Sequence, residues 1–193
     1  MKKLKISPSI VILVIFCAIF NKFLLFLNYF VALAIHELAH FYIASKRGYC
    51  MKEFKIDLFG CSMELDGNVD DRDSFAVNIA GPCINLFLCL VCLALYYLFP
   101  TSYIYLNLFC ISNLILALFN LLPIYPLDGG KIVSGIIKNR KVYKIVDISI
   151  RVIFSLIFLT LFIISLYSGP NYFYLIMIIS LVCANNKRAP SFS

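Results

Sequence analysis

Six apolar segments, separated by short polar or turn-forming stretches, dominate the hydropathy pattern of the chain. They cover residues 9–20, 23–44, 75–99, 103–122, 152–167 and 172–184. Apolar stretches of about 17–25 residues suit helices that cross a bilayer, and proline or glycine follows several of these segments. We therefore predict an all-α polytopic membrane protein with six transmembrane helices, forming one membrane-embedded domain over residues 1–193.

The polar stretch between the second and third segments follows another pattern. Polar and apolar residues alternate over 53–59 and again over 61–66, with glycine at positions 60 and 67. This period of two predicts a short β-hairpin-like loop, with a solvated amphipathic linker as the alternative. The free edge of such a hairpin can pair with an extended substrate strand.

Lysine and arginine residues lie at the ends of the apolar segments. If the N-terminus is cytoplasmic and the six segments alternate, all but one of the 17 basic residues are cytoplasmic, the exception being Lys22. Since basic loops stay in the cytoplasm, we predict a multi-pass protein of the cell membrane with both termini and the hairpin-like loop cytoplasmic. No small-residue cleavage site follows Phe20, so we expect the first segment to be an uncleaved span.

Composition narrows the class of protein further. Hydrophobic residues make up 62% of the chain, which is more than a soluble domain of this size can bury, so the lipid bilayer is its expected surrounding. The net charge of +7 is spread over segment ends, and we expect no nucleic acid partner. Cys89 and Cys92 form a C-x-x-C, which we interpret as small apolar residues of a helix.

The chain has two histidines, and they lie four residues apart in His36-Glu37-Leu38-Ala39-His40, inside the second apolar segment. Positions i and i+4 share a helix face, so both imidazoles can reach one metal ion. Ionisable residues at bilayer depth are costly and usually functional. The pattern predicts a Zn²⁺ site with His36 and His40 as ligands and Glu37 as the catalytic base.

A catalytic zinc ion takes a third protein ligand. Asp128 follows Pro123 and Pro126, which interrupt the helix, and precedes two glycines that permit a tight turn. It lies near the cytoplasmic end of the fourth segment, at the depth of the two histidines in the second. We predict Asp128 as the third ligand. The alternative ligand is Glu64, in which case Asp128 would be a turn residue before glycine.

Two asparagines in apolar segments are candidates for a further role. The amides of Asn85 and Asn120 can donate to the oxyanion that develops at a scissile carbonyl. The alternative is that both amides cap helices or bond between helices.

These motifs together resemble the site-2 proteases, which are intramembrane zinc metalloproteases. The resemblance is carried by His36-Glu37-Leu38-Ala39-His40, by Ala80-Gly81-Pro82-Cys83-Ile84-Asn85, and by Asn120-Leu121-Leu122-Pro123 with Leu127-Asp128-Gly129. It covers nearly the whole chain and is similar to the sporulation branch. The resemblance implies zinc held by His36, His40 and Asp128, with Glu37 as base.

The resemblance also implies a function and partners. A site-2 protease hydrolyses a peptide bond within or next to the membrane in a membrane-associated protein, which in the sporulation branch is a sigma-factor precursor. Regulatory membrane proteins hold that branch inactive until a signal arrives. The chain stops at Ser193, and we expect neither the CBS domain of the sporulation enzyme nor ATP regulation through it. The alternative function is a membrane metal transporter or metal-binding protein without protease activity.

Overall fold

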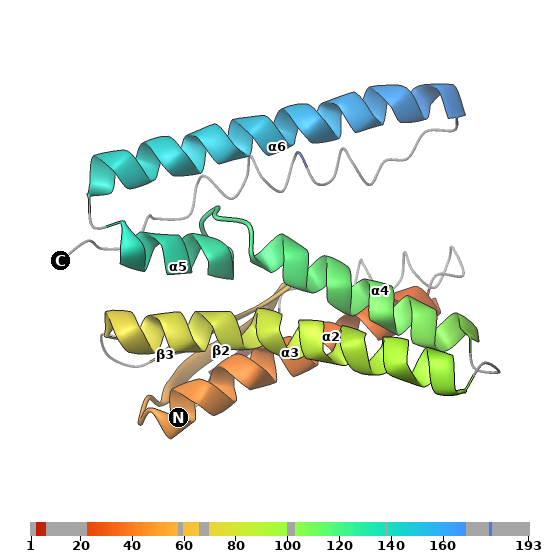
Figure 1. Cartoon of the computed structure of the whole chain (residues 1–193). Coiled ribbons are helices and arrows are strands. Elements are labelled where there is room, and N and C mark those ends of the chain that lie inside the picture. Colours follow the sequence, from red (N-terminus) through yellow and green to blue (C-terminus); the bar gives the residue numbers. More distant parts are fainter. Residues whose placement is uncertain are drawn as a thin grey trace. The chain divides into compact units, whose positions relative to one another are not determined.

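The computed structural model describes residues 3–6, 23–57, 60–65, 70–99, 103–137, 139–168 and 178. The elements in chain order are β1 (Lys3–Ile6), α2 (Phe23–Lys46), β2 (Met51–Asp57), β3 (Gly60–Leu65), α3 (Asp71–Leu98), α4 (Tyr103–Asn120), α5 (Asp128–Ile136) and α6 (Arg140–Ser168) (Figure 1). They fall into two compact units, Met1–Asn120 and Leu121–Ser193. The interpretation of residues 1–193 as one domain stays a prediction.

Four of the six predicted apolar segments are confirmed as helices, namely α2, α3, α4 and α6. Two stretches, Arg72–Leu98 and Arg140–Leu166, are long and apolar enough to cross a membrane, and α4 contributes the shorter apolar stretch Leu106–Asn120. The predicted segments at 9–20 and 172–184 lie outside the described residues, apart from residue 178. Six spans therefore stay a prediction.

Helix α6 begins earlier than the sequence predicted. The apolar segment starts at residue 152, but the helix starts at Arg140 and includes the polar stretch before it. The side-chain oxygen of Asn139 accepts hydrogen bonds from the backbone N–H groups of Lys141 and Val142, at 3.0 and 3.3 Å. This cap satisfies donors that a helix start leaves unpaired, and no glycine or proline follows before Gly169.

Helices α2, α3 and α4 pack against one another in the first unit. Ala32 and Leu33 of α2 meet Leu116 of α4, with Phe109 beside them. The outward side chains of α3 are apolar as well, and Phe87, Leu90 and Leu98 are all more than half exposed. An apolar exterior over a packed helical core is what a lipid surrounding requires, since lipid tails are as apolar as leucine.

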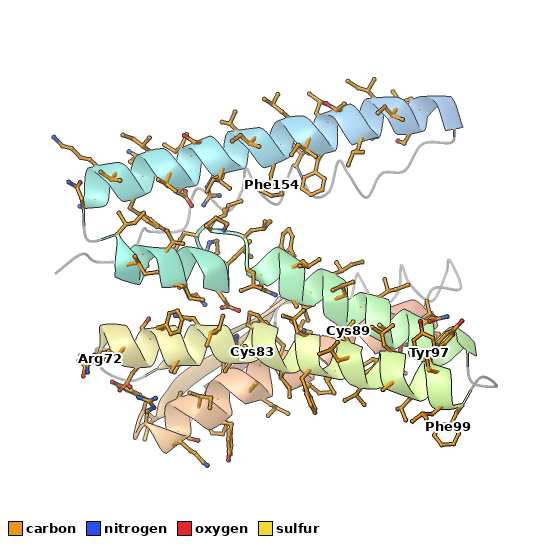
Figure 2. The ribbon with its side chains drawn as sticks, viewed as in Figure 1. Arg72, Cys83, Cys89, Tyr97, Phe99 and Phe154 are labelled. Atoms are coloured by element: carbon orange, nitrogen blue, oxygen red, sulfur yellow. The ribbon has the colours of Figure 1, made fainter. Side chains whose placement is uncertain are left out.

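Cys89 and Cys92 pack as apolar residues of a helix, as the sequence predicted. Cys89, Cys92 and Cys110 are buried together between α3 and α4. The Sγ atom of Cys89 lies 3.2 Å from that of Cys110 on the neighbouring helix. Figure 2 shows Cys89 on α3 between Arg72 at one end of the helix and Tyr97 near the other.

A small sheet accompanies the helices of the first unit, with strand order β1-β2-β3. Strands β2 and β3 are antiparallel, in the polar stretch where the sequence predicted a hairpin-like loop. Residues 58 and 59, where the turn would lie, are outside the described part, so a closed hairpin stays a prediction. Strand β1 pairs with β2 in parallel, which the basic N-terminal sequence did not predict.

Candidate metal centre

The histidine pair lies in the middle of α2, one helical turn apart, as the spacing predicted. The two Nε2 atoms are 3.1 Å from each other, and the rings meet edge to face with centroids 4.7 Å apart. Both side chains are buried, at 2% and 6% exposure. Two nitrogens bound to one tetrahedral zinc ion at about 2.0–2.1 Å would lie roughly 3.3 Å apart, so the pair fits such an ion.

Helix α3 fixes the orientation of one of these rings. The Nδ1 atom of His40 lies 2.6 Å from the backbone carbonyl oxygen of Val77. Since a carbonyl only accepts, His40 carries its proton on Nδ1 and donates it to Val77. The lone pair is then on Nε2 and points toward His36. Metal-binding histidines commonly donate their second ring nitrogen in this way.

A glycine of α3 makes room for the two imidazoles. A Cβ atom at Gly81 would lie 2.6 Å from Nε2 of His36 and closer still to Nε2 of His40. Any larger side chain would therefore occupy the space beside the two Nε2 atoms. Pro82 follows inside the helix, where its missing N–H leaves the carbonyl of residue 78 without its usual helical donor.

Glu37 is next to His36 and is also buried, at 9% exposure. A carboxylate in an apolar helix is costly unless it binds a metal, a proton or a hydrogen-bond donor. Its burial beside the histidine pair is consistent with the predicted role as base.

Polar contacts tie the residues that follow α2 to the first turn of α3. Arg47 forms an ion pair with Asp73, and the Tyr49 hydroxyl donates to the other Asp73 oxygen at 3.0 Å. The Asp70 N–H that donates to the Tyr49 oxygen lowers the pKa of the phenol, but desolvation and the Asp73 carboxylate outweigh it and raise the pKa. The phenol therefore stays protonated and keeps donating at neutral pH.

The two candidate oxyanion donors differ in their contacts. Asn120 donates its Nδ2 to the carbonyl of Leu116, at 3.0 Å within its own helix. Asn85 is fully buried, and its amide nitrogen and oxygen have no hydrogen-bond partner in the described part of the chain. It follows Gly81 by one helical turn and so lies on the α3 face that meets the histidines. Of the two candidates, Asn85 is therefore the one whose amide N–H groups are available to donate to a scissile carbonyl.

Asp128 belongs to the second unit, where it is the first residue of α5 and 4% exposed. The chain before it, residues 121–127, is irregular, as the two prolines predicted. Lys131 contacts the carboxylate, with Nζ 3.2 Å from Oδ1. The contact is an ion pair between residues i and i+3 of the same helix.

The two glycines after Asp128 were predicted to permit a tight turn, and this is wrong. Both lie in the first turn of α5. A Cβ at Gly129 would lie 2.5 Å from backbone atoms of Leu121 and Leu122, and one at Gly130 would meet the backbone of Ile124 as closely. These glycines therefore let α5 pack directly on the irregular segment that precedes it.

Several residues around these groups were missed from the sequence. Val77 acts through its backbone, which no side-chain pattern indicates, and Gly81 was quoted only as part of a motif. Asp147 and Arg151 of α6 are buried as an ion pair. Opposite charges at i and i+4 next to an apolar segment were the available signal, but the sequence interpretation placed them in a polar connection. Glu64 lies on β3 opposite Glu53, and its side chain is outside the described part.

Comparisons with known proteins agree with this architecture. Residues 98–165 match the family model described as Peptidase family M50. The zinc metalloprotease MJ0392 of Methanocaldococcus jannaschii is 30% identical over 62% of this chain and 36% of its own length. Stage IV sporulation protein FB of Bacillus subtilis is 38% identical over 51% of this chain and 35% of its own length.

A putative zinc metalloprotease of Synechocystis, sll0528, is 37% identical over 56% of this chain and 30% of its own length. The chain therefore spans about a third of the length of the curated relatives it matches. Among solved structures, the site-2 protease from Methanocaldococcus jannaschii has a TM-score of 0.69 with 23% identity, covering 100% of this chain and 94% of that one. This likeness establishes a shared fold.

Proposed function

We propose that this chain is a zinc metalloendopeptidase of the site-2 protease type that acts within or next to the membrane, supported by its match to the Peptidase family M50 model and its likeness to zinc metalloproteases. The observation that carries the proposal is the buried pair of imidazoles on α2, whose Nε2 atoms are 3.1 Å apart. Ionisable side chains in an apolar helix are costly, and a purely structural role would not require two histidines at this spacing with a carboxylate between them.

Zn²⁺ is the metal of the proposed site, and His36, His40 and Asp128 are its ligands. Two imidazoles and one carboxylate are a donor set typical of catalytic zinc, and all three side chains are buried and of a kind that can hold a metal ion. The histidines come from the first unit and the aspartate from the second, so the complete ligand set is part of the proposal.

The residues divide the work of peptide hydrolysis between them. Zinc, when bound, supplies Lewis-acid activation of water and of the scissile carbonyl. Glu37 accepts a proton from the attacking water and delivers it to the leaving amine nitrogen. Asn85, and secondarily Asn120, donates a hydrogen bond to the carbonyl oxygen as negative charge develops there.

The proposed substrate is a membrane-associated protein. The basic residues favour a multi-pass arrangement with both termini in the cytoplasm, and the edge of the small sheet offers main-chain groups to an extended segment. A sigma-factor precursor of the sporulation type is the candidate suggested by the likeness to Stage IV sporulation protein FB. Membrane proteins that hold the protease inactive are the corresponding regulatory partners.

The test compares the wild type with Glu37→Gln, which is nearly isosteric but cannot accept the proton. Cells that express each form are compared by identifying the N-termini of their membrane-associated proteins. We expect new N-termini with the wild type only, while both purified proteins carry zinc. Identical N-termini in both samples would refute the protease.

The alternative is a membrane metal transporter. It is disfavoured because the histidines, Glu37 and their α3 contacts lie close together on two helices and do not trace a path across the membrane. Zinc flux into proteoliposomes separates the two functions, since a protease is expected to give none above protein-free vesicles.

A further inference from the structure

The irregular segment 121–127 connects the two motif residues Asn120 and Asp128. Backbone N–H and C=O groups in such a segment lack the internal partners of a helix, and at membrane depth they need partners from the protein itself. Within the second unit, the N–H groups of Ile124 and Leu127 bond to carbonyls of the segment itself. For Tyr125, α6 supplies the partners through a pair of charged side chains one helical turn apart.

These side chains are Asp147 and Arg151, each only 8% exposed. Arg151 donates from Nε to Oδ2 of Asp147 at 2.7 Å and from Nη2 to Oδ1 at 3.2 Å. This is the two-point geometry that a guanidinium makes with a carboxylate. A buried ion pair gains little stability over a well-packed apolar pair, so its presence calls for a second reason.

The reason lies at Tyr125. Its backbone N–H donates to Oδ1 of Asp147 at 2.8 Å, and its carbonyl accepts from Nη2 of Arg151. The ion pair thus binds the donor and the acceptor of one residue in the middle of the irregular segment. On the other side of Asp128, the hydroxyl of Tyr143 donates to the Gly130 carbonyl at 3.3 Å.

We propose that Asp147 and Arg151 are positioning residues that fix the backbone of segment 121–127 and thereby orient the Asp128 carboxylate. The inference rests on the proposed function in taking Asp128 as a metal ligand. The fork of Arg151 is essential, since one ammonium group of lysine cannot reach both the Tyr125 carbonyl and the Asp147 carboxylate. The order of the two residues along α6 is essential too, because only a carboxylate or amide oxygen at position 147 accepts from the Tyr125 N–H.

The experiment uses the full chain in detergent micelles, with Asp147→Asn, Arg151→Lys, and the exchanged pair D147R/R151D. Lys144→Met is the matched control, because Lys144 is an exposed basic residue of the same helix. The first readout is amide hydrogen exchange of a peptide covering residues 121–130. The second is zinc affinity, measured by competition with a chelator.

Arg151→Lys is expected to speed exchange in this peptide about tenfold and to weaken zinc binding about tenfold, at the lower end of what loss of a supporting shell costs. Asp147→Asn keeps an acceptor for Tyr125 and is expected to have a smaller effect. The exchanged pair retains opposite charges but presents the wrong groups to Tyr125, so it is expected to be as defective as Arg151→Lys. Lys144→Met should match the wild type.

Three results would overturn the proposal. The first is unchanged exchange in Arg151→Lys, and the second is full recovery in the exchanged pair, which would reduce the contact to an ordinary ion pair. The third is faster exchange with unaltered zinc affinity. If the wild type binds no zinc, the proposed function fails, while the exchange rates still decide whether the ion pair holds the segment.

Discussion

At the scale of single residues, the candidate metal centre depends on the space beside Gly81, which has no side chain, as much as on the histidines themselves. Gly81→Ala would put a methyl group 2.6 Å from Nε2 of His36, on the side from which a metal must approach. Both imidazoles belong to a packed helix and cannot withdraw far. We expect at least tenfold weaker zinc binding, measured by chelator competition, with helix content unchanged by circular dichroism.

Gly135→Ala is the matched control for this substitution. Gly135 is a helical residue of α5, and among the described residues no atom outside its own helix lies within 4 Å of a Cβ at this position. Alanine there should leave zinc binding unchanged and stabilise the protein by about 0.5–1 kcal/mol. Equal zinc affinity in both variants would contradict the close approach of α3 to the histidines.

The two candidate oxyanion donors are expected to respond differently to replacement by leucine. An unpartnered buried amide costs about 1–3 kcal/mol, so Asn85→Leu should leave the thermal unfolding temperature unchanged or raise it. The same change should lower kcat about 100-fold if Asn85 donates in the transition state. Asn120→Leu removes a bond to its own helix and should affect kcat less.

The measurement is kcat of each variant against a substrate identified from the N-terminal comparison, beside thermal unfolding in detergent. A lower unfolding temperature for Asn85→Leu with normal kcat would assign this amide to the fold alone.

These residues also show which features of the site could be predicted from the sequence and which could not. The histidine spacing predicted the pair on α2 because an i and i+4 relation depends on local helix geometry alone. The acceptor at Val77 and the space at Gly81 come from another helix, and packing between helices has no local signature. The contacts that orient the two histidines could therefore not be predicted from the sequence, although the pair on α2 could; its role as metal ligands stays a prediction.

At the scale of elements, α6 shows where a hydropathy pattern misleads. The pattern marks where a helix becomes apolar and not where it begins, so the polar stretch up to Arg151 was interpreted as a connection. The Asn139 cap and the absence of glycine and proline decide the start of the helix. Asp147 and Arg151 consequently contact Tyr125 from within a helix.

The cap provides a test of this helix start. Asn139→Ala removes the acceptor for the N–H groups of Lys141 and Val142, and we expect a loss of about 1 kcal/mol in the free energy of unfolding. Asn139→Asp retains an acceptor and should preserve stability. Denaturation in mixed micelles measures the difference, and equal values for alanine and aspartate would mean that the helix starts elsewhere.

At the scale of the whole molecule, the proposed ligands are divided between two compact units, with His36 and His40 before Asn120 and Asp128 after it. A ligand that binds only the folded protein stabilises it in proportion to its affinity. If one zinc ion takes ligands from both units, removal of any ligand should abolish the same stabilisation.

The wild type in zinc at about 100 times its Kd should gain roughly 2.7 kcal/mol over the chelator-treated protein. His40→Ala and Asp128→Ala should both lose this gain, while Glu64→Ala, which replaces the alternative ligand, should keep it. Thermal unfolding with and without chelator measures each case at equal protein concentration. A full zinc-dependent rise in unfolding temperature in Asp128→Ala, together with its loss in Glu64→Ala, would identify Glu64 on β3 as the third ligand in place of Asp128 on α5. The proposed roles of His36 and His40 would be unaffected by that result.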